Sequence, residues 1–584
     1  MNNYSGLTKT IFLPFLLFIL STALLAQNNI HKIENLLHTN YEQGRFNGSA
    51  LVAYNGKVIF KKGFGLANME WDIPNAADTK HRLGSITKQF TAMLILQLAA
   101  EGTVDLHTPI TKYLPDYPSD NGDRVSIHHL LTHTSGIPNY TAFPGFFQEK
   151  SRNPYTPKEF VKEFWDLPLE FEPGPKFNYS NSAYFLLGVI IEELTGNSYQ
   201  EELQKRILDP LGMKSSGYDL SGPILKNRAS GYDKNGRLYR NTNYIDMSLP
   251  YAAGSMYSTV EDLFLWDRAL YTTDLIPQKY MDLYFKSHTE GLGRRYAYGW
   301  SVGKIPLGTS QDSVYTIGHG GGINGFNTLI TRAPSNESTV ILLNNTGGTS
   351  LNEMAGSILA ILNDKSYELP KKSLAYHLLD AIQQKGLSSG LKDFEKAKND
   401  DTYELSENEM NSIGYQFLQH KKVEAAEAVF KINMKSFPNS SNVYDSYAES
   451  LMIQNKNEEA IKYYRKSIEL NPANQNGIDM LVKLGVSKEE FEKKVDVSEK
   501  VLASYIGKYE LMPNFIITIT KNGKQLSAQA TGQSAFDIFP SSEDRFYLKA
   551  IEAQIQFNKD DAGSVISLTL FQGGREMPGK KIAY

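Results

Sequence analysis

The order of apolar and polar positions predicts an antiparallel sheet in the first part of the chain. Residues 49–54 and 57–60 read as two strands around Asn55-Gly56, a dipeptide that tolerates the positive φ of a two-residue turn. Short apolar or β-branched runs return at 313–317, 327–331 and 339–344. We expect these late runs to complete the sheet that the hairpin begins.

The stretch between these strands is mostly helical in pattern. The segment with the clearest helical pattern, Ile86 to Ala100, is apolar on nearly every side and ends at Glu101-Gly102. A helix that lacks a polar face belongs in a hydrophobic core.

From about residue 366 the chain changes to charged helices with an internal repeat. Ala426 and Ala460 stand 34 residues apart, as do Phe430 and Tyr464. This is the tetratricopeptide period, and it predicts two units over 410–442 and 444–473 with flanking helices that cap them. An ordinary pair of helical hairpins is the alternative.

After Ser498 the pattern returns to strands. Apolar runs lie at 515–519, 526–529, 545–549, 554–557 and 567–570. The predicted organisation is a signal peptide over 1–26, a first domain over 27–365, a helical linker over 366–405, tetratricopeptide-like repeats over 406–490 and a small all-β domain over 498–584.

The composition of the chain limits the number of domains, the partners and the kinds of chemistry that can be expected. A chain of 584 residues is too long for one hydrophobic core, which agrees with several domains. The formal net charge of -4 argues against the large basic surface that nucleic acids select. The chain has no cysteine, which excludes disulfides, a thiol nucleophile and thiolate metal sites.

The first residues are typical of an export signal. Lys9 precedes an apolar run from Ile11 to Leu25 that is short and interrupted for a membrane span. Cleavage after Ala23 or after Ala26 fits, and we expect an exported protein, periplasmic or secreted, with no stable membrane span in the mature chain. An uncleaved amino-terminal anchor is the alternative.

Ser85-Ile86-Thr87-Lys88 is the strongest candidate for chemistry. A serine nucleophile needs a base and donors for the oxyanion, and residues three apart on a helix share one face. Lys88 can therefore reach the Ser85 hydroxyl, and burial would favour its neutral form. The spacing alone occurs by chance in many surface helices, but here it opens the apolar helix.

Three other motifs have simpler interpretations. Gly386 to Gly390 matches Gly-x-Ser-x-Gly but follows a helical stretch, so we interpret it as a loop. Gly320 to Gly325 matches Gly-x-Gly-x-x-Gly but leads into a strand, where a dinucleotide site needs a helix. His129 and His133 have a metal-like spacing, yet a role at a helix end or in a loop is favoured, and no metal is expected.

Further motifs give the chain its resemblance to a known family. Tyr179-Ser180-Asn181 and His319-Gly320-Gly321 follow Ser85 in the order found in the penicillin-binding protein and β-lactamase superfamily. Tyr179-Ser180-Asn181 is similar to the Tyr-x-Asn element of the class C β-lactamase branch. His319-Gly320-Gly321 has the His-x-Gly form that is found in related esterases and peptidases. The resemblance covers about residues 30 to 360 and implies an α+β fold, an antiparallel sheet flanked by helices, with a helical insertion that carries Tyr179.

The resemblance also implies roles for the site residues. Tyr179 would act with Lys88 as the general base, because a phenol beside a cation loses its proton more readily. Asn181 would orient the acylating carbonyl, and the backbone N–H groups of Ser85 and Gly322 would form the oxyanion hole. The His319-Gly320-Gly321 strand would bind substrate. Deacylation would reuse Tyr179 and Lys88.

His319 is the main departure from the β-lactamase pattern. A lysine there would offer a permanent positive charge to a substrate carboxylate, which a histidine does not. The sequence therefore predicts a serine hydrolase without cofactor that cleaves an ester, or an amide next to a D-amino acid, in a small molecule or peptide. The alternatives are a true β-lactamase or D-alanyl-D-alanine carboxypeptidase, or a non-catalytic module that binds peptidoglycan or a protein through the repeats.

Overall fold

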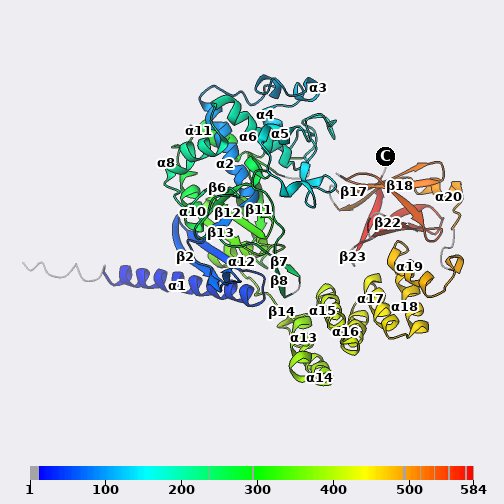
Figure 1. Ribbon diagram of the computed structural model, residues 1–584. Coiled ribbons are helices and arrows are strands. Elements are labelled where there is room, and N and C mark those ends of the chain that lie inside the picture. Colours follow the sequence, from blue (N-terminus) through cyan, green and yellow to red (C-terminus); the bar gives the residue numbers. More distant parts are fainter. Residues whose placement is uncertain are drawn as a thin grey trace, which may run out of the picture. The chain divides into compact units, whose positions relative to one another are not determined.

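The computed structural model describes residues 12–582 except 236, 292–294, 491–494, 513–514, 532, 550, 552 and 573–574. The chain forms two compact units, Met1–Pro370 and Lys371–Tyr584. Figure 1 shows the elements of both units, and each unit is described here by itself.

A six-stranded antiparallel sheet forms the centre of the first unit. Its order is β10-β11-β12-β13-β1-β2, so the first strands of the chain pair with the last strands of the unit. Asn55 and Gly56 both have positive φ, at 50° and 70°, and close the predicted hairpin. The bounds are β1 Gly48–Tyr54, β2 Lys57–Phe64, β10 Ser301–Pro306, β11 Ser313–Ile323, β12 Phe326–Ala333 and β13 Ser338–Asn344. The predicted sheet is confirmed, and β10 was not anticipated.

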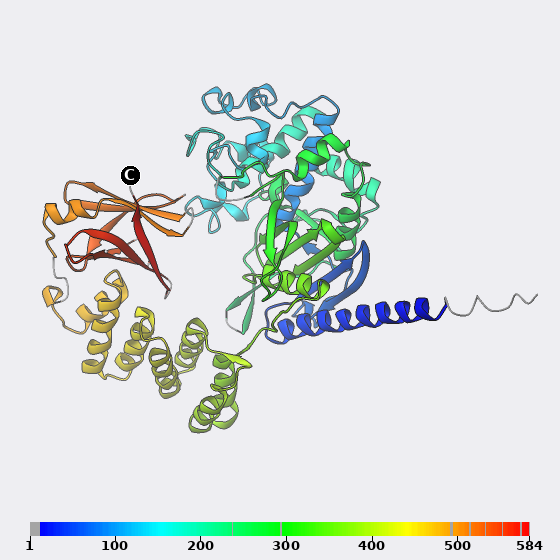
Figure 2. The ribbon, with the colours of Figure 1, turned by 180° about the vertical axis from the view of Figure 1, so that it is seen from behind.

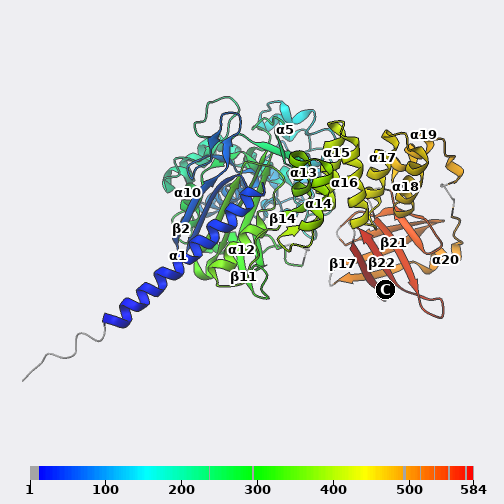
Figure 3. The same ribbon diagram turned by 90° about the horizontal axis from the view of Figure 1, so that it is seen from below.

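Two helices from opposite ends of the unit cover one face of this sheet. They are α1 (Phe12–Glu42) and α12 (Asn352–Leu362), which lie beside each other in Figure 3. Ile33, Leu36 and Leu37 of α1 are buried there against Val52 of β1 and other apolar side chains. This half of α1 follows both predicted cleavage sites, so cleavage would leave its buried residues in place.

The amino-terminal export signal stays a prediction. Residues 1–11 of the predicted signal peptide lie outside the described residues, and 12–26 belong to α1. Across the described part of the chain, every helix is too short or too polar to cross a membrane.

Helices cover the other face of the sheet and enclose the largest core of the unit (Figure 2). They include α2 (Thr87–Ala100), α6 (Asn181–Thr195) and α10 (Val260–Ala269). Every residue of α2 from Thr87 to Ala99 is buried, as its apolar pattern predicts. Arg332 of β12 and Asp267 of α10 form a buried ion pair at 3.0 Å, which joins helix and sheet inside this core.

The second unit begins with paired helices, in agreement with the predicted helical region. Ala426, Phe430, Ala460 and Tyr464 are all fully buried in its core, so the positions that recur at 34 residues have equivalent environments. The assignment to the tetratricopeptide class stays a prediction. The helices are α13 Leu374–Lys385, α14 Leu387–Ala397, α15 Glu407–Gln419, α16 Val423–Ser436, α17 Ser441–Ile453, α18 Asn457–Leu470 and α19 Gln475–Lys483.

The interpretation of Gly386 to Gly390 as a loop was wrong. Gly386 has a φ of 80° and separates α13 from α14, and the following residues form the first turn of α14. A Cβ on Gly390 would lie 2.8 Å from the backbone nitrogen of Ile382. The glycines therefore allow a sharp turn and a close helix contact.

The last part of the chain is a closed eight-stranded barrel, which confirms the predicted all-β domain. Tyr505, Tyr509 and Phe557 lie in its core, and the rings of Tyr505 and Phe557 stack at 4.0 Å. The strands are β16 Gly507–Met512, β17 Phe515–Asn522, β18 Gln525–Ala530, β19 Phe536–Pro540, β20 Arg545–Leu548, β21 Ala553–Lys559, β22 Val565–Gln572 and β23 Arg575–Ile582.

Candidate active site

Ser85 lies in a 3-10 turn, Gly84–Ile86, that leads into α2. Gly84 has a φ of +56°, and a Cβ there would lie 2.9 Å from the backbone nitrogen of Gly322. The Thr328 hydroxyl of β12 donates to the Leu83 carbonyl at 2.6 Å. Glycine and threonine thus hold the turn against the sheet, with Ser85 half-buried at the surface of the cleft.

Lys88 is fully buried beside Ser85. Its Nζ lies 3.1 Å from Ser85 Oγ, 2.8 Å from Asn181 Oδ1 and 2.8 Å from the Ala253 carbonyl. Burial holds the pKa of the amine well below its usual value, because desolvation disfavours the charged form. The predicted approach of the amine to the serine is present.

Tyr179 and Asn181 flank the start of α6. Ser180 is the N-cap of that helix, and its hydroxyl accepts from the Ala183 N–H. The ring of Tyr179 has its centroid 4.8 Å from Lys88 Nζ. Asn181 donates through Nδ2 to Thr141 at 3.1 Å, which orients its carbonyl oxygen toward Lys88. The structure brings both residues to the Ser85–Lys88 pair.

His133 is a neighbour of the site that the sequence did not identify. It follows α4 (Ile127–Leu131), and its Nδ1 accepts from the Ser180 N–H at 3.1 Å. Its ring lies 4.2 Å from the ring of Tyr179. An Nδ1 that accepts from an N–H carries no proton, so His133 positions the Tyr179 segment as a hydrogen-bond acceptor. His133 lies in the loop after α4, in agreement with the predicted position at a helix end or in a loop.

His319 lies on β11 with both ring nitrogens engaged. Nδ1 is 2.6 Å from the Gly320 carbonyl, and Nε2 is 2.9 Å from the hydroxyl of Tyr296. A carbonyl can only accept, so Nδ1 carries the proton; in the neutral ring Nε2 then accepts from Tyr296. Tyr296, fully buried, is a second neighbour that the sequence missed.

Gly321 and Gly322 bring β11 against the serine turn. A Cβ on Gly321 would lie 1.8 Å from the Leu83 carbonyl, so no other residue fits without a shift of the backbone. Gly320 and Gly322 are not crowded in this way, since their nearest neighbours would be 3.5 and 3.9 Å away. The Gly-x-Gly-x-x-Gly string is therefore the end of a strand and its turn.

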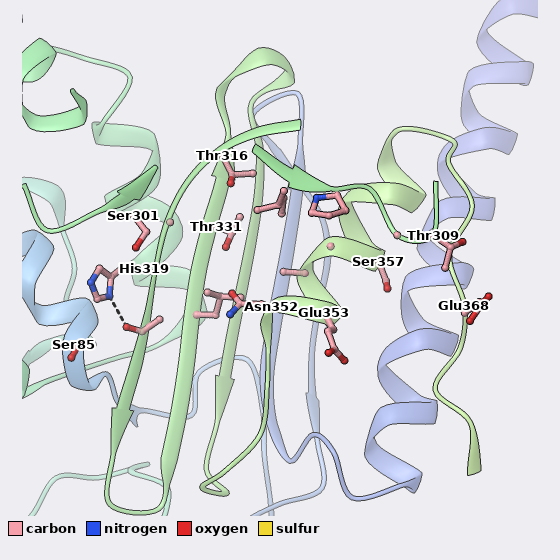
Figure 4. A pocket seen from close by; sticks show the side chains of 18 of the residues that line it. Ser85, Ser301, Thr309, Thr316, His319, Thr331, Asn352, Glu353, Ser357 and Glu368 are labelled. Atoms are coloured by element: carbon pink, nitrogen blue, oxygen red, sulfur yellow. Dashed lines mark hydrogen bonds between the residues drawn. The ribbon is translucent and has the colours of Figure 1, made fainter. Parts of the chain in front are cut away.

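Two cavities meet at Ser85. The larger, of about 1040 Å³, is lined by Tyr179 and His319, and Figure 4 shows Ser85 and His319 at one end of it. The smaller, of about 270 Å³, is lined by Asn181 and Gly322 together with apolar side chains, which include Phe146, Phe147, Ile245, Leu249 and Ile323. Among the described residues, histidines and carboxylates form no group of three placed to hold a metal ion.

Comparison with known proteins agrees with this arrangement. The family model described as Beta-lactamase matches residues 30–363, and a second, Domain of unknown function (DUF3471), matches 492–581. Penicillin-binding protein 4* of Bacillus subtilis (strain 168) is 28% identical over 367 residues, which cover 59% of this chain and 79% of that protein.

Two solved structures are similar as well. D-amino acid amidase of Ochrobactrum anthropi SV3, complexed with L-phenylalanine amide, is 26% identical with a TM-score of 0.50, over 58% of this chain and 99% of that one. The octameric penicillin-binding protein homologue from Pyrococcus abyssi, 22% identical with a TM-score of 0.50, covers 94% of this chain and 100% of its own, and shows the fold alone. The family model matches more than half of the chain. The chain thus belongs to the β-lactamase and penicillin-binding protein family, and it is a serine hydrolase.

Proposed function

We propose that the chain is an exported hydrolase that acts through an acyl-enzyme on Ser85 and cleaves an ester or an amide next to a D-amino acid. The contacts of Lys88 Nζ carry the proposal. Asn181 Oδ1 and the Ala253 carbonyl only accept, so they engage both hydrogens of a neutral amine. The third contact of Nζ is with Ser85 Oγ at 3.1 Å, where Nζ is the donor. When the amine is neutral, its lone pair is left for this contact and can accept the proton of the Ser85 hydroxyl.

This geometry supports the following first step. Lys88, with Tyr179 above it, takes the proton of Ser85 as Oγ attacks the substrate carbonyl. The close approach of Gly84 to Gly322 supports an oxyanion hole made by the backbone N–H groups of Ser85 and Gly322. Asn181 orients the amine and the acylating carbonyl. Water then releases the acyl group with the help of the same two bases.

The contacts of His319 support the proposal that the substrate is an ester or an amide and not a β-lactam. Its Nδ1 donates to the Gly320 carbonyl and its Nε2 meets the Tyr296 hydroxyl, so both nitrogens are occupied within the protein. A neutral ring in that arrangement offers no fixed positive charge to a substrate carboxylate. The likeness to a D-amino acid amidase supports the amide branch of the proposal.

The smaller cavity supports an apolar acyl group. Phe146, Phe147 and Leu249 line it next to Ser85 and Asn181. A site of this kind favours an aromatic or branched aliphatic side chain on the acyl carbon.

A substrate panel tests the proposal. Purified protein and its Ser85→Ala variant are compared on p-nitrophenyl esters, D- and L-phenylalanine amides, D-alanyl amides and nitrocefin. We expect turnover of the esters, a preference for the D-amide over the L-amide, little turnover of nitrocefin, and none of these activities in the variant. Faster turnover of nitrocefin than of any ester or amide would contradict the proposed substrate class.

Export and a protein partner for the second unit complete the proposal. The apolar amino-terminal run supports export, and the repeat at 34 residues supports a partner for the tetratricopeptide-like helices. Fractionation of the native host, followed by amino-terminal sequencing of the mature protein, tests the first. A chain that begins at Met1 in the cytoplasm would contradict it.

A further inference from the structure

The larger cavity extends far beyond the candidate catalytic residues. It runs from Ser85 and His319 to the first half of α12 and the segment after that helix. Figure 4 shows Ser85 and His319 at one end and Glu353 and Glu368 toward the other. Most of its volume of about 1040 Å³ therefore has no part in the chemistry described above.

Missing side chains create this space between the sheet and α12. Gly318 pairs with Thr331 and Gly320 with Leu329, so these four residues face α12 together. On the helix, Gly356 faces the same space. A sheet and a helix are normally separated by interdigitated side chains. Gly320 and Gly356, where an added Cβ would have no neighbour closer than 3.5 Å, leave part of that layer empty, whereas at Gly318 a Cβ would meet the Ile330 carbonyl at 2.8 Å. We call the space the α12 chamber.

The chamber reaches the cleft around the edge of β11. Within the described residues, β10 pairs with β11 as far as Gly318. Beyond that point no described strand pairs with His319 and Gly320 on this side, and both residues line the cavity. A substrate bound at Ser85 can therefore extend past His319 into the chamber.

The chamber has polar walls and negative charge. Thr331 is only 6% exposed, and its hydroxyl makes no hydrogen bond with any described residue, although it opens onto the cavity. A hydroxyl that faces a cavity and has no protein partner can form a hydrogen bond with a polar ligand group. Glu353 and Glu368 form no ion pair within the described part of the chain, and the described lining residues include no lysine or arginine.

The side of the cleft that receives the leaving group follows from Tyr179. Tyr179 lines the larger cavity, whereas Asn181 and Gly322 line the apolar one. The bond from Ser85 Oγ to the carbonyl carbon forms as the bond to the leaving atom breaks. The proton taken from Ser85 passes through Lys88 and Tyr179 to that leaving atom, which must then lie on the side of Tyr179.

We propose that the α12 chamber binds the leaving group of the substrate and selects one that carries an organic ammonium charge. The proposal rests on the acyl transfer at Ser85 proposed above. Glu353 and Glu368, both exposed, supply the charge that attracts the cation, and the Thr331 hydroxyl, which lies between His319 and these glutamates in Figure 4, supplies a polar contact for the leaving group. The acyl group then occupies the apolar cavity on the opposite side of Ser85.

Three thioesters with the same phenylacetyl group test this selection. Their leaving thiols share one tetra(ethylene glycol) spacer that ends in a trimethylammonium group, an uncharged tert-butyl group or a carboxylate, so that the end group can pass His319 into the chamber and the remote charge leaves the acidity of the thiol nearly unchanged. Ellman's reagent measures the released thiol without background, because the chain has no cysteine. We expect kcat/KM for the ester with the ammonium end group to exceed that for the neutral ester by about tenfold and that for the anionic ester by more, with the preference falling at high salt.

Variants that remove negative charge test whether Glu353 and Glu368 select the cation. Glu353→Gln combined with Glu368→Gln should reduce the preference for the cation to within about twofold. The control, Glu458→Gln combined with Glu459→Gln on exposed positions of α18, removes the same charge from the second unit and should keep the preference.

The outcomes that would contradict the charge selection differ from those that would contradict the proposed function. Equal rates for the charged and neutral esters in the unaltered protein would overturn the selection while the Ser85 chemistry stands. A preference that survives Glu353→Gln with Glu368→Gln would also overturn it, because the cation would then bind elsewhere. Release of none of the three thiols would overturn the proposed function, and this inference with it.

Discussion

Lys88 shows how one buried side chain can be prepared for proton transfer. Its amine is surrounded by two obligate acceptors, the Ser85 hydroxyl and the faces of two aromatic rings, Tyr179 at 4.8 Å and Tyr184 at 5.5 Å from Nζ. Among the described residues, none of the hydrogen-bond partners of Nζ is a carboxylate. Burial therefore lowers the pKa of the amine without an opposing ion pair.

The pH dependence of the reaction follows from this lowered pKa. The active form has a neutral amine, so kcat/KM should rise with pH through the pKa of Lys88 and reach its plateau well below 10.5, the ordinary value. Lys88→Arg keeps a proton at all pH values and should lower kcat/KM on the order of 10³-fold. The exposed Lys112→Arg serves as the control, and a rate that still climbs near pH 10 would contradict the assignment.

A second prediction at the scale of single residues concerns Tyr296. Tyr296→Phe removes the hydroxyl that meets His319 Nε2 and should lower kcat/KM by about tenfold, because the ring loses the bond that fixes its orientation. Tyr298→Phe is a matched control two residues away, since the Tyr298 hydroxyl contacts His128 instead. Steady-state kinetics with one ester compares the two, and equal losses would contradict the role of Tyr296.

At the scale of elements, the pattern of apolar positions located most of what places the site. It predicted the hairpin at Asn55-Gly56, the buried helix after Ser85 and the three late strands, because each has a local signal of period or turn chemistry. It missed β10, whose residues include a glycine and a proline and alternate weakly. It also mistook the glycines at 386 and 390 for a loop, since a tight helix contact has no local signal.

The contacts of His133 and Tyr296 with the site could not be predicted from the sequence for a related reason. His133 meets Ser180 across 47 residues, and Tyr296 meets His319 across 23. Neither pair shares an element, so no periodicity relates them. Ser85, Lys88, Tyr179, Asn181 and His319 could be proposed as site residues because of their motifs. The contacts of His133 and Tyr296 with the site become visible only through tertiary packing.

Close packing of β11 against the serine turn gives a prediction for this element. Gly321→Ala would place a Cβ 1.8 Å from the Leu83 carbonyl and should lower the free energy of unfolding by about 1 to 3 kcal/mol. In Gly320→Ala the nearest contact is 3.5 Å, and the change should stay below about 1 kcal/mol. Denaturant unfolding measures both, and equal stability of the two variants would contradict the close approach.

At the scale of the whole molecule, the candidate chemistry lies entirely in the first unit. Every described residue that lines the two cavities falls within Met1–Pro370, and α1 supplies Ile33 and Leu36 to the core of that unit. The second unit has its own helical core and its own barrel core. The two units are therefore expected to fold independently.

A fragment of residues 27–370 tests this independence. It keeps the buried half of α1 and should hydrolyse a small ester with kcat/KM within about threefold of the full chain. Circular dichroism confirms that the fragment is folded. A folded fragment that has lost its activity would show that the second unit contributes to the site.

The most direct test of the central claim is covalent labelling of Ser85. The full chain is incubated with a fluorophosphonate, and intact mass and peptide mapping locate the adduct. The account predicts one adduct, on Ser85, formed with loss of ester hydrolysis, and neither adduct nor hydrolysis in Ser85→Ala. An adduct on another residue, or ester hydrolysis that persists in Ser85→Ala, would contradict it.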